Sequence, residues 1–144
     1  MQLGLHTGSI MHTNLLTDIR VAKEAGYDAI EIYLPKLLRY LDAGYKPEEL
    51  LPHLRTLPVG MINSFLHVER QDAASRRELR GLCERVCAVA QTLGCPALQV
   101  VALDALRGQS WTEIRTKVGR SLAELADIAA PFGVTLALEP VSFT

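Results

Sequence analysis

Three ionisable side chains lie at or near the ends of short apolar runs in this sequence. Each of the residues His6, Glu31 and Glu139 alternates with aliphatic neighbours, so in an extended chain it shares one side with small residues. An imidazole and two carboxylates gathered on one face can hydrogen-bond a polar substrate. These residues are therefore the first candidates for a functional site.

Glu139 is the strongest of these candidates. It ends the apolar run at residues 134–139 and is followed by Pro140, which limits further strand pairing. Functional side chains of α/β proteins gather at the carboxyl ends of parallel strands, where this carboxylate is expected. We interpret it as a functional group, with a salt-bridged structural glutamate as the alternative.

Glycines precede several of the apolar runs. The segments 25–28 (AGYD), 93–96 (LGCP) and 132–133 (FG) each lead into strand-forming residues. A glycine tolerates the left-handed conformation that follows a helix, so each segment indicates a helix end and then a strand. Strands are predicted at residues 3–7, 29–33, 59–65, 97–103 and 134–139.

Capping residues mark the helix starts. Ser110 and Glu113 have the spacing of a capping box, and the same spacing recurs at Ser75. Asn14 is suited to cap a helix, and Pro47 is suited to a first turn. Helices are predicted at residues 15–25, at 47–54, from 75 to 94 and from 110 to 129.

Strands and helices alternate strictly, which is typical of a parallel sheet with right-handed crossovers. In three strands an aliphatic face opposes a face of small residues ending in an ionisable one, whereas an open sheet covered on both sides is more often aliphatic on both. The pattern favours an α/β fold of the (β/α)8 TIM barrel type. Residues 1–144 are expected to form a single domain that supplies about the first four βα units and the fifth strand.

The length of the chain falls short of a whole barrel. A full barrel takes roughly 250 residues, against the 144 residues present here. A sheet that stops after its fifth strand leaves an open edge. The chain is therefore expected to be a fragment, the N-terminal half of a TIM barrel, or a half-barrel that pairs with another chain as a homo-oligomer.

Composition narrows the classes of protein. The residues are 49% hydrophobic, which suffices for one substantial core, and the formal charge of −1 gives no general attraction toward nucleic acid. No run approaches the roughly 20 apolar residues of a membrane span, so a cytoplasmic protein without membrane contact is expected. The three cysteines, an odd number, argue for buried thiols and against a disulfide framework.

Two segments resemble a known family. Residues 24–32 (EAGYDAIEI) and 132–140 (FGVTLALEP) look like the xylose-isomerase-like superfamily of sugar phosphate isomerases and epimerases, and the likeness runs across the whole chain. The resemblance implies a metal-dependent barrel enzyme of carbohydrate metabolism. It also implies that Glu139 binds a divalent metal ion (Mn, Mg, Co or Zn) and takes a catalytic part in proton transfer.

The implied reaction explains why such a glutamate is needed. Isomerising or epimerising a sugar or sugar phosphate removes a proton next to a carbonyl, and a divalent cation stabilises the resulting enediolate. A carboxylate beside the metal can act as the base. The other ligands in the family, an aspartate, a histidine and a second glutamate, come from later strands. This chain alone is therefore expected to be inactive.

Besides Glu139, four residues are expected to bind substrate. His6 can hydrogen-bond a sugar or polyol, or it can pack against a carboxylate such as Glu31. Glu31 has the same parity as His6 and can orient it or contact the substrate. Asn63 can bond a sugar hydroxyl or serve a structural role. His67 follows the third strand, either in a loop that lines the site or on the surface.

Other functions fit parts of the pattern. A dehydratase or lyase acting on a similar polyol acid would have the same features. An endonuclease IV-like DNA repair enzyme shares the barrel and the fifth-strand glutamate, and His67 is suited to be one of its extra metal ligands. That enzyme needs a basic surface, which a charge of −1 does not favour. A non-catalytic half-barrel is the remaining alternative, and it predicts that replacing Glu139 changes nothing.

Overall fold

The computed structural model describes residues 1–103 and 108–140, which contain one five-stranded sheet with all neighbouring strands parallel. The strands lie side by side in chain order: β1 (Gly4–His6), β2 (Ala29–Tyr33), β3 (Val59–Leu66), β4 (Ala97–Val101) and β5 (Thr135–Leu138). The predicted strand at residues 97–103 ends two residues early, at Val101, and the other predicted strands agree to within one residue at each end.

Helices connect the strands. The α-helices are α1 (Leu15–Glu24), α2 (Leu34–Asp42), α3 (Leu51–Leu54), α4 (Ala73–Leu93) and α5 (Trp111–Ala129). Short 3₁₀ turns are η1 (Thr7–Ile10), η2 (Pro47–Leu50) and η3 (Ala130–Phe132). None of these helices within the described ranges is long and apolar enough to cross a membrane.

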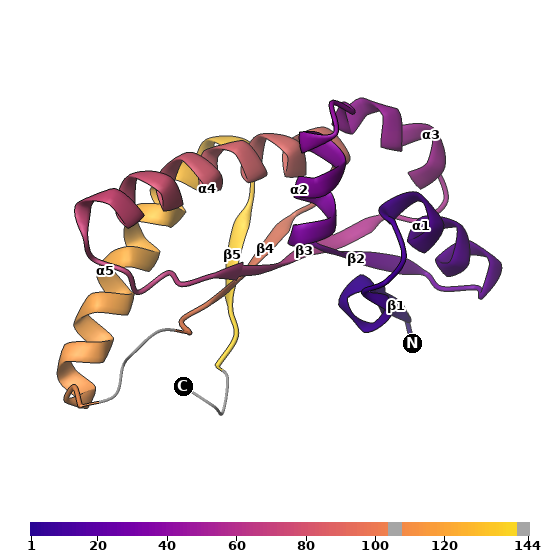
Figure 1. Ribbon diagram of the computed structural model, residues 1–144. Helices are drawn as coiled ribbons and strands as arrows, with labels where there is room; N and C mark the ends of the chain where they lie inside the picture. The colour runs from indigo at the N-terminus through magenta and orange to yellow at the C-terminus, as the bar shows by residue number, and fades with distance from the viewer. Residues whose placement is uncertain (104–107, 141–144) are drawn as a thin grey trace.

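The order of the strands decides how the sheet is covered. A doubly wound sheet reverses its strand order at one point, whereas this sheet runs from β1 to β5 without reversal. Right-handed crossovers that always step in the same direction place their helices on one face. Figure 1 shows α2 and α4 on the same side of the strands. The sheet is therefore built like part of a barrel wall, as the alternation of side chains predicts.

The capping predictions hold for two helices and fail for one. The Asn14 side chain accepts a hydrogen bond from Thr17 N at 2.9 Å, and Ser110 forms its capping box with Glu113. The prediction that Ser75 caps a helix is wrong. Asp72 caps α4 and accepts from Ser75 N at 2.9 Å, because Ser75 is the third residue of the helix and its amide needs an acceptor. That hydrogen bond lowers the pKa of the Asp72 carboxyl.

Two helical features depart from the sequence prediction. Helix α2 was not predicted, because it follows β2 directly and its first residue is preceded by Tyr33, whose side chain makes no capping bond. The predicted helix at residues 47–54 forms in two pieces, η2 and α3, since Pro52 lies at the start of the second piece.

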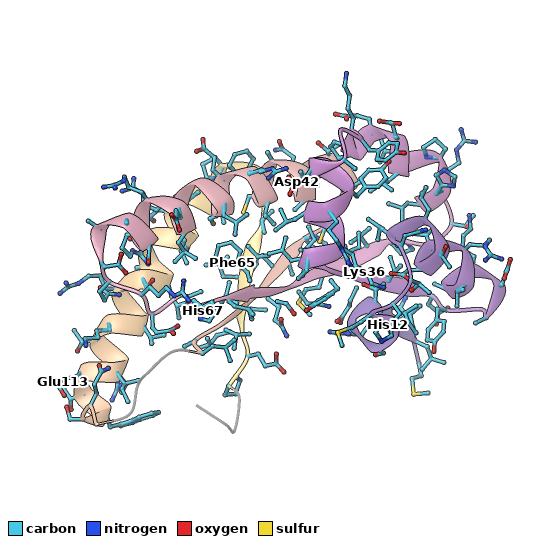
Figure 2. The ribbon with its side chains drawn as sticks, viewed as in Figure 1. His12, Lys36, Asp42, Phe65, His67 and Glu113 are labelled. Carbon is cyan, nitrogen blue, oxygen red and sulfur yellow. The ribbon has the colours of Figure 1, made fainter. Side chains whose placement is uncertain are left out.

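The core lies between the sheet and its helices. Ile30 and Ile32 are fully buried on that side of β2, whereas Glu31 between them is only partly buried. Phe65 of β3 is likewise fully buried and lies on the helix side of the sheet (Figure 2). The predicted division into an aliphatic face and a more polar face is therefore confirmed.

The three cysteines are free thiols, as predicted, and all are buried. Cys83 and Cys87 lie one turn apart on α4 with 4.0 Å between their sulfur atoms. Burial raises the pKa of the Cys95 thiol, which keeps that group protonated at neutral pH. These residues behave as part of the core.

A buried ion pair fixes the segment after β1 against α2. Lys36 Nζ lies 2.5 Å from Asp18 Oδ2, and the two side chains are 1% and 0% exposed. The same ammonium donates to the carbonyl oxygen of Ile10 at 2.8 Å and to Thr13 Oγ1 at 3.2 Å. Figure 2 shows Lys36 beside this segment. One buried charge thus joins α1, α2 and the turn between β1 and α1.

Replacing Lys36 by Met is expected to destabilise the fold by about 3–5 kcal/mol, because it leaves the Asp18 carboxylate buried without its cation. Urea denaturation measures the loss. The matched control is Arg20→Met in the exposed pair with Glu24, whose side chains are 65% and 62% exposed and which should change stability by at most about 0.5 kcal/mol. Equal losses in the two variants would contradict the role assigned to the buried pair.

Candidate functional site

A row of polar side chains crosses the sheet on the face opposite the helices. It comprises Glu31 of β2, Asn63 and Ser64 of β3, Gln99 of β4 and Glu139 directly after β5. The row includes three of the predicted site residues, Glu31, Asn63 and Glu139. Hydrogen bonds between neighbouring strands connect its members.

An irregularity in β3 lies at the centre of the row. Ile62 pairs with Leu98 and Phe65 pairs with Val100. Between these two pairs, β3 therefore contains one more residue than β4. The extra residue forms a bulge, in which Ser64 takes a left-handed backbone conformation with φ of 70°. The amide of Ser64 donates to the side-chain oxygen of Gln99 at 2.6 Å.

Glu139 is held at both its backbone and its side chain. Its amide donates to Val100 O at 3.1 Å, which continues the pairing of β5 with β4 for one more residue. Gln99 Nε2 donates to Glu139 Oε2. The residue is nonetheless exposed. The carboxylate therefore lies at the carboxyl end of the last strand, on the polar face, and remains accessible.

Glu31 and Asn63 meet at the other end of the row. Asn63 Nδ2 lies 3.5 Å from Glu31 Oε2, and Asn63 is fully buried. Ser64 Oγ donates to Asn63 Oδ1 at 3.3 Å. Both polar atoms of the Asn63 amide thus have protein partners, which favours the structural role over direct contact with a sugar hydroxyl.

His6 lies at the open edge of the sheet. It pairs in register with Glu31, but no hydrogen bond joins the two side chains within the described residues. The imidazole is exposed and rests over Gly8. A hydrogen bond between His6 and Glu31, one of the two predicted roles, is therefore not formed, and the ring is accessible to a ligand.

His67 follows the end of β3 and is partly buried. Its backbone has a φ of 64°, an unusual conformation for a residue other than glycine. Its carbonyl oxygen accepts a hydrogen bond from Arg70 N at 3.2 Å, which closes a turn. The partial burial fits either of the two predicted roles, a residue that lines the site or a residue on the surface, so the role of His67 stays a prediction.

Two members of the row were missed by the sequence analysis. Gln99 lies between the aliphatic residues Leu98 and Val100, so the alternation that identified Glu139 also places Gln99 on the polar face. Ser64 has no comparable signal, because a bulge shifts the alternation in a way that the residue types do not reveal.

The donor set for a metal ion is incomplete in the described part of the chain. Those residues contain no group of three or more His, Cys, Asp or Glu side chains that could hold a metal ion. Glu139 offers one accessible carboxylate, a type of oxygen ligand that divalent cations accept. The chain therefore fits one ligand position of such a centre and not a complete site.

Comparison with known proteins identifies the fold. A family model described as xylose isomerase-like TIM barrel matches residues 19–144. Inosose isomerase from Bacillus velezensis is 30% identical over 134 residues, which are 91% of this chain and 48% of that protein. The chain thus spans about half the length of the curated relatives it matches.

Solved structures agree with this result. A crystal structure of the IOLI protein with a bound zinc atom has a TM-score of 0.87 and 26% identity, and the match covers 96% of this chain and 51% of that one. The 3-keto-D-glucoside 4-epimerase YcjR from E. coli has a TM-score of 0.77 and 24% identity, over 98% of this chain and 56% of that one. The predicted fold, about half of a TIM barrel, is confirmed.

Replacing Gly8 by Ala is expected to displace the His6 ring. A Cβ added at Gly8 would overlap Cε1 of the imidazole and approach its Nδ1 at 2.8 Å, so the exposed ring must rotate away. NMR resonances of the His6 ring report the change. Gly4→Ala is the control, because its added Cβ meets only Ala29 O at 3.9 Å. Unchanged His6 resonances in Gly8→Ala would contradict the packing described here.

Proposed function

This chain belongs to the xylose isomerase-like TIM barrel family, and from that premise we propose that the whole protein is a divalent-metal-dependent isomerase or epimerase of a sugar, polyol or sugar phosphate. The observation that carries the proposal is the accessible carboxylate of Glu139 at the carboxyl end of β5. In barrels of this architecture the active site lies at that end of the strands. The relatives named inosose isomerase support a polyol-like substrate.

The proposed reaction moves a proton on a carbon next to a carbonyl. A divalent ion (Mn, Mg, Co or Zn), once bound, would supply a positive charge that favours an enediolate. Glu139 is the residue of this chain that would hold the ion, and its exposed carboxylate would take up the proton. The zinc atom in the IOLI protein supports a divalent ion as the cofactor.

The other polar residues have supporting roles in the proposal. His6 is accessible at the far edge of the same face. Its imidazole can donate a hydrogen bond to a substrate hydroxyl or accept one from it. Glu31 is partly exposed beside it and can accept one. His67 lies after β3, where loops of a barrel line the site, and can contact the same substrate.

The remaining ligands would come from outside the described residues, which contain no group of three or more candidate ligands. One carboxylate binds a divalent ion weakly, so the 144-residue chain alone is proposed to be inactive until the rest of a barrel is supplied. A second copy of this chain or a further segment of a longer protein can supply it. The mass of the protein in solution distinguishes the two.

Glu139→Gln is expected to remove the preferred Mn²⁺ site of the chain. Mn²⁺ broadens NMR signals of nearby nuclei, so even weak binding should first broaden the amides of residues 137–139 in the unmodified protein. The variant should need more than about tenfold more Mn²⁺ for the same effect, because it loses the charged ligand. The control is Glu48→Gln, at an exposed glutamate of η2.

Broadening that is centred elsewhere, or that is unchanged in Glu139→Gln, would contradict the metal role. The reaction itself is tested after co-expression with residues that complete the barrel of the Bacillus velezensis relative. In heavy water with Mn²⁺ and an inosose, this assembly should exchange the hydrogen next to the carbonyl. Exchange that survives Glu139→Gln would exclude the proposed base.

A further inference from the structure

We propose that Gln99 is a positioning residue for Glu139, because the bulge of β3 fixes its side-chain amide so that the NH2 group must face one carboxylate oxygen. The inference rests on the proposed function, in which Glu139 is the metal ligand. It goes beyond that function by assigning the group that orients the ligand.

The bulge leaves a backbone amide that needs an acceptor, and the Gln99 side chain provides one. Between the pairs Ile62 with Leu98 and Phe65 with Val100, β3 contributes two residues and β4 contributes one. An extra residue leaves an amide that the regular ladder does not pair, and a partly buried amide without a partner loses the energy of a hydrogen bond. The Gln99 side chain accepts from this amide, that of Ser64, at 2.6 Å.

This contact decides which way the Gln99 amide is turned. A backbone N–H can only donate, so the atom of Gln99 that meets Ser64 N must be the oxygen. The nitrogen therefore points the other way, toward Glu139 Oε2. Turning the amide over would set its NH2 group against the N–H of Ser64 and its oxygen against a carboxylate, which are two repulsive contacts.

The arrangement leaves part of the carboxylate available. Apart from the bond from Gln99, the described residues make no hydrogen bond to the Glu139 side chain. One oxygen is thus held by a neutral donor, and the other is left for a cation or a proton. A lysine or arginine in this place would neutralise the charge of the carboxylate. A neutral amide orients the carboxylate and adds no charge of its own. Gln99 thereby holds one carboxylate oxygen of Glu139 in place and leaves the other free to bind.

The NH2 resonances of Gln99 test this contact directly. They can be assigned because they disappear in Gln99→Leu. The proton bonded to Glu139 should be shifted downfield in the unmodified chain, and the shift should disappear in Glu139→Ala. The amide proton of Ser64 should stay in place in Glu139→Ala, because its acceptor remains. Identical Gln99 resonances in the two proteins would overturn the inference.

A second measurement tests whether the orientation matters for binding. Outer contacts that orient metal ligands typically contribute 10–100-fold to affinity, so Gln99→Leu should raise the Mn²⁺ concentration that half-broadens the Glu139 region by about tenfold. The Gln99 resonances in Glu139→Ala test the same contact without a change in β4, which guards against a Gln99 variant that fails to fold. The glutamine control is Gln91→Leu, exposed on α4.

The outcomes separate the two proposals. If Gln99 bonds Glu139 but Mn²⁺ binds the unmodified chain nowhere near residue 139, the proposed function fails and the positioning of the carboxylate stands. If Mn²⁺ binds there and Gln99→Leu binds it as tightly as Gln91→Leu does, the positioning role fails and the metal role stands.

Discussion

The arrangement of this protein depends on one constraint, the unreversed order of its five parallel strands. Because right-handed crossovers step in one direction, the helices pack on one face and bury the aliphatic side chains there. Polar side chains are then left to the opposite face, which in a barrel is the interior. The row from Glu31 to Glu139 exists because alternation along each strand assigns every second residue to that face.

The polar face also contains a departure from regular strand pairing. In a perfect ladder every backbone amide of β3 would pair with a neighbouring strand. No free amide would then fix the orientation of the Gln99 side chain. The bulge at Ser64 breaks the ladder and recruits a side chain from β4. A local defect in pairing is thus converted into a fixed contact beside Glu139, in keeping with the frequent occurrence of bulges near active sites.

The sequence predicted the features that recur along the chain, namely the strands and most helices, and missed features that occur at one position only. Glycines at helix ends and alternating strands identified β1 to β5, and Glu139 followed from parity. Helix α2 was missed because it starts without a capping side chain, and Asp72 was overlooked because its partner Ser75 mimics a cap. The contact between Ser64 and Gln99 depends on strand register, and one residue of slippage is invisible in residue types.

The position of Glu139 explains why the described half-barrel would offer one ligand of the proposed metal site and no group of three or more metal-binding side chains. Parallel strands each present one or two side chains at their carboxyl ends, so several ligands require several strands. Strand β5 pairs only with β4 among the described strands, and its other edge is open. Glu139 therefore lies at the border of the sheet, where Gln99 of β4 holds its side chain and the residue is exposed.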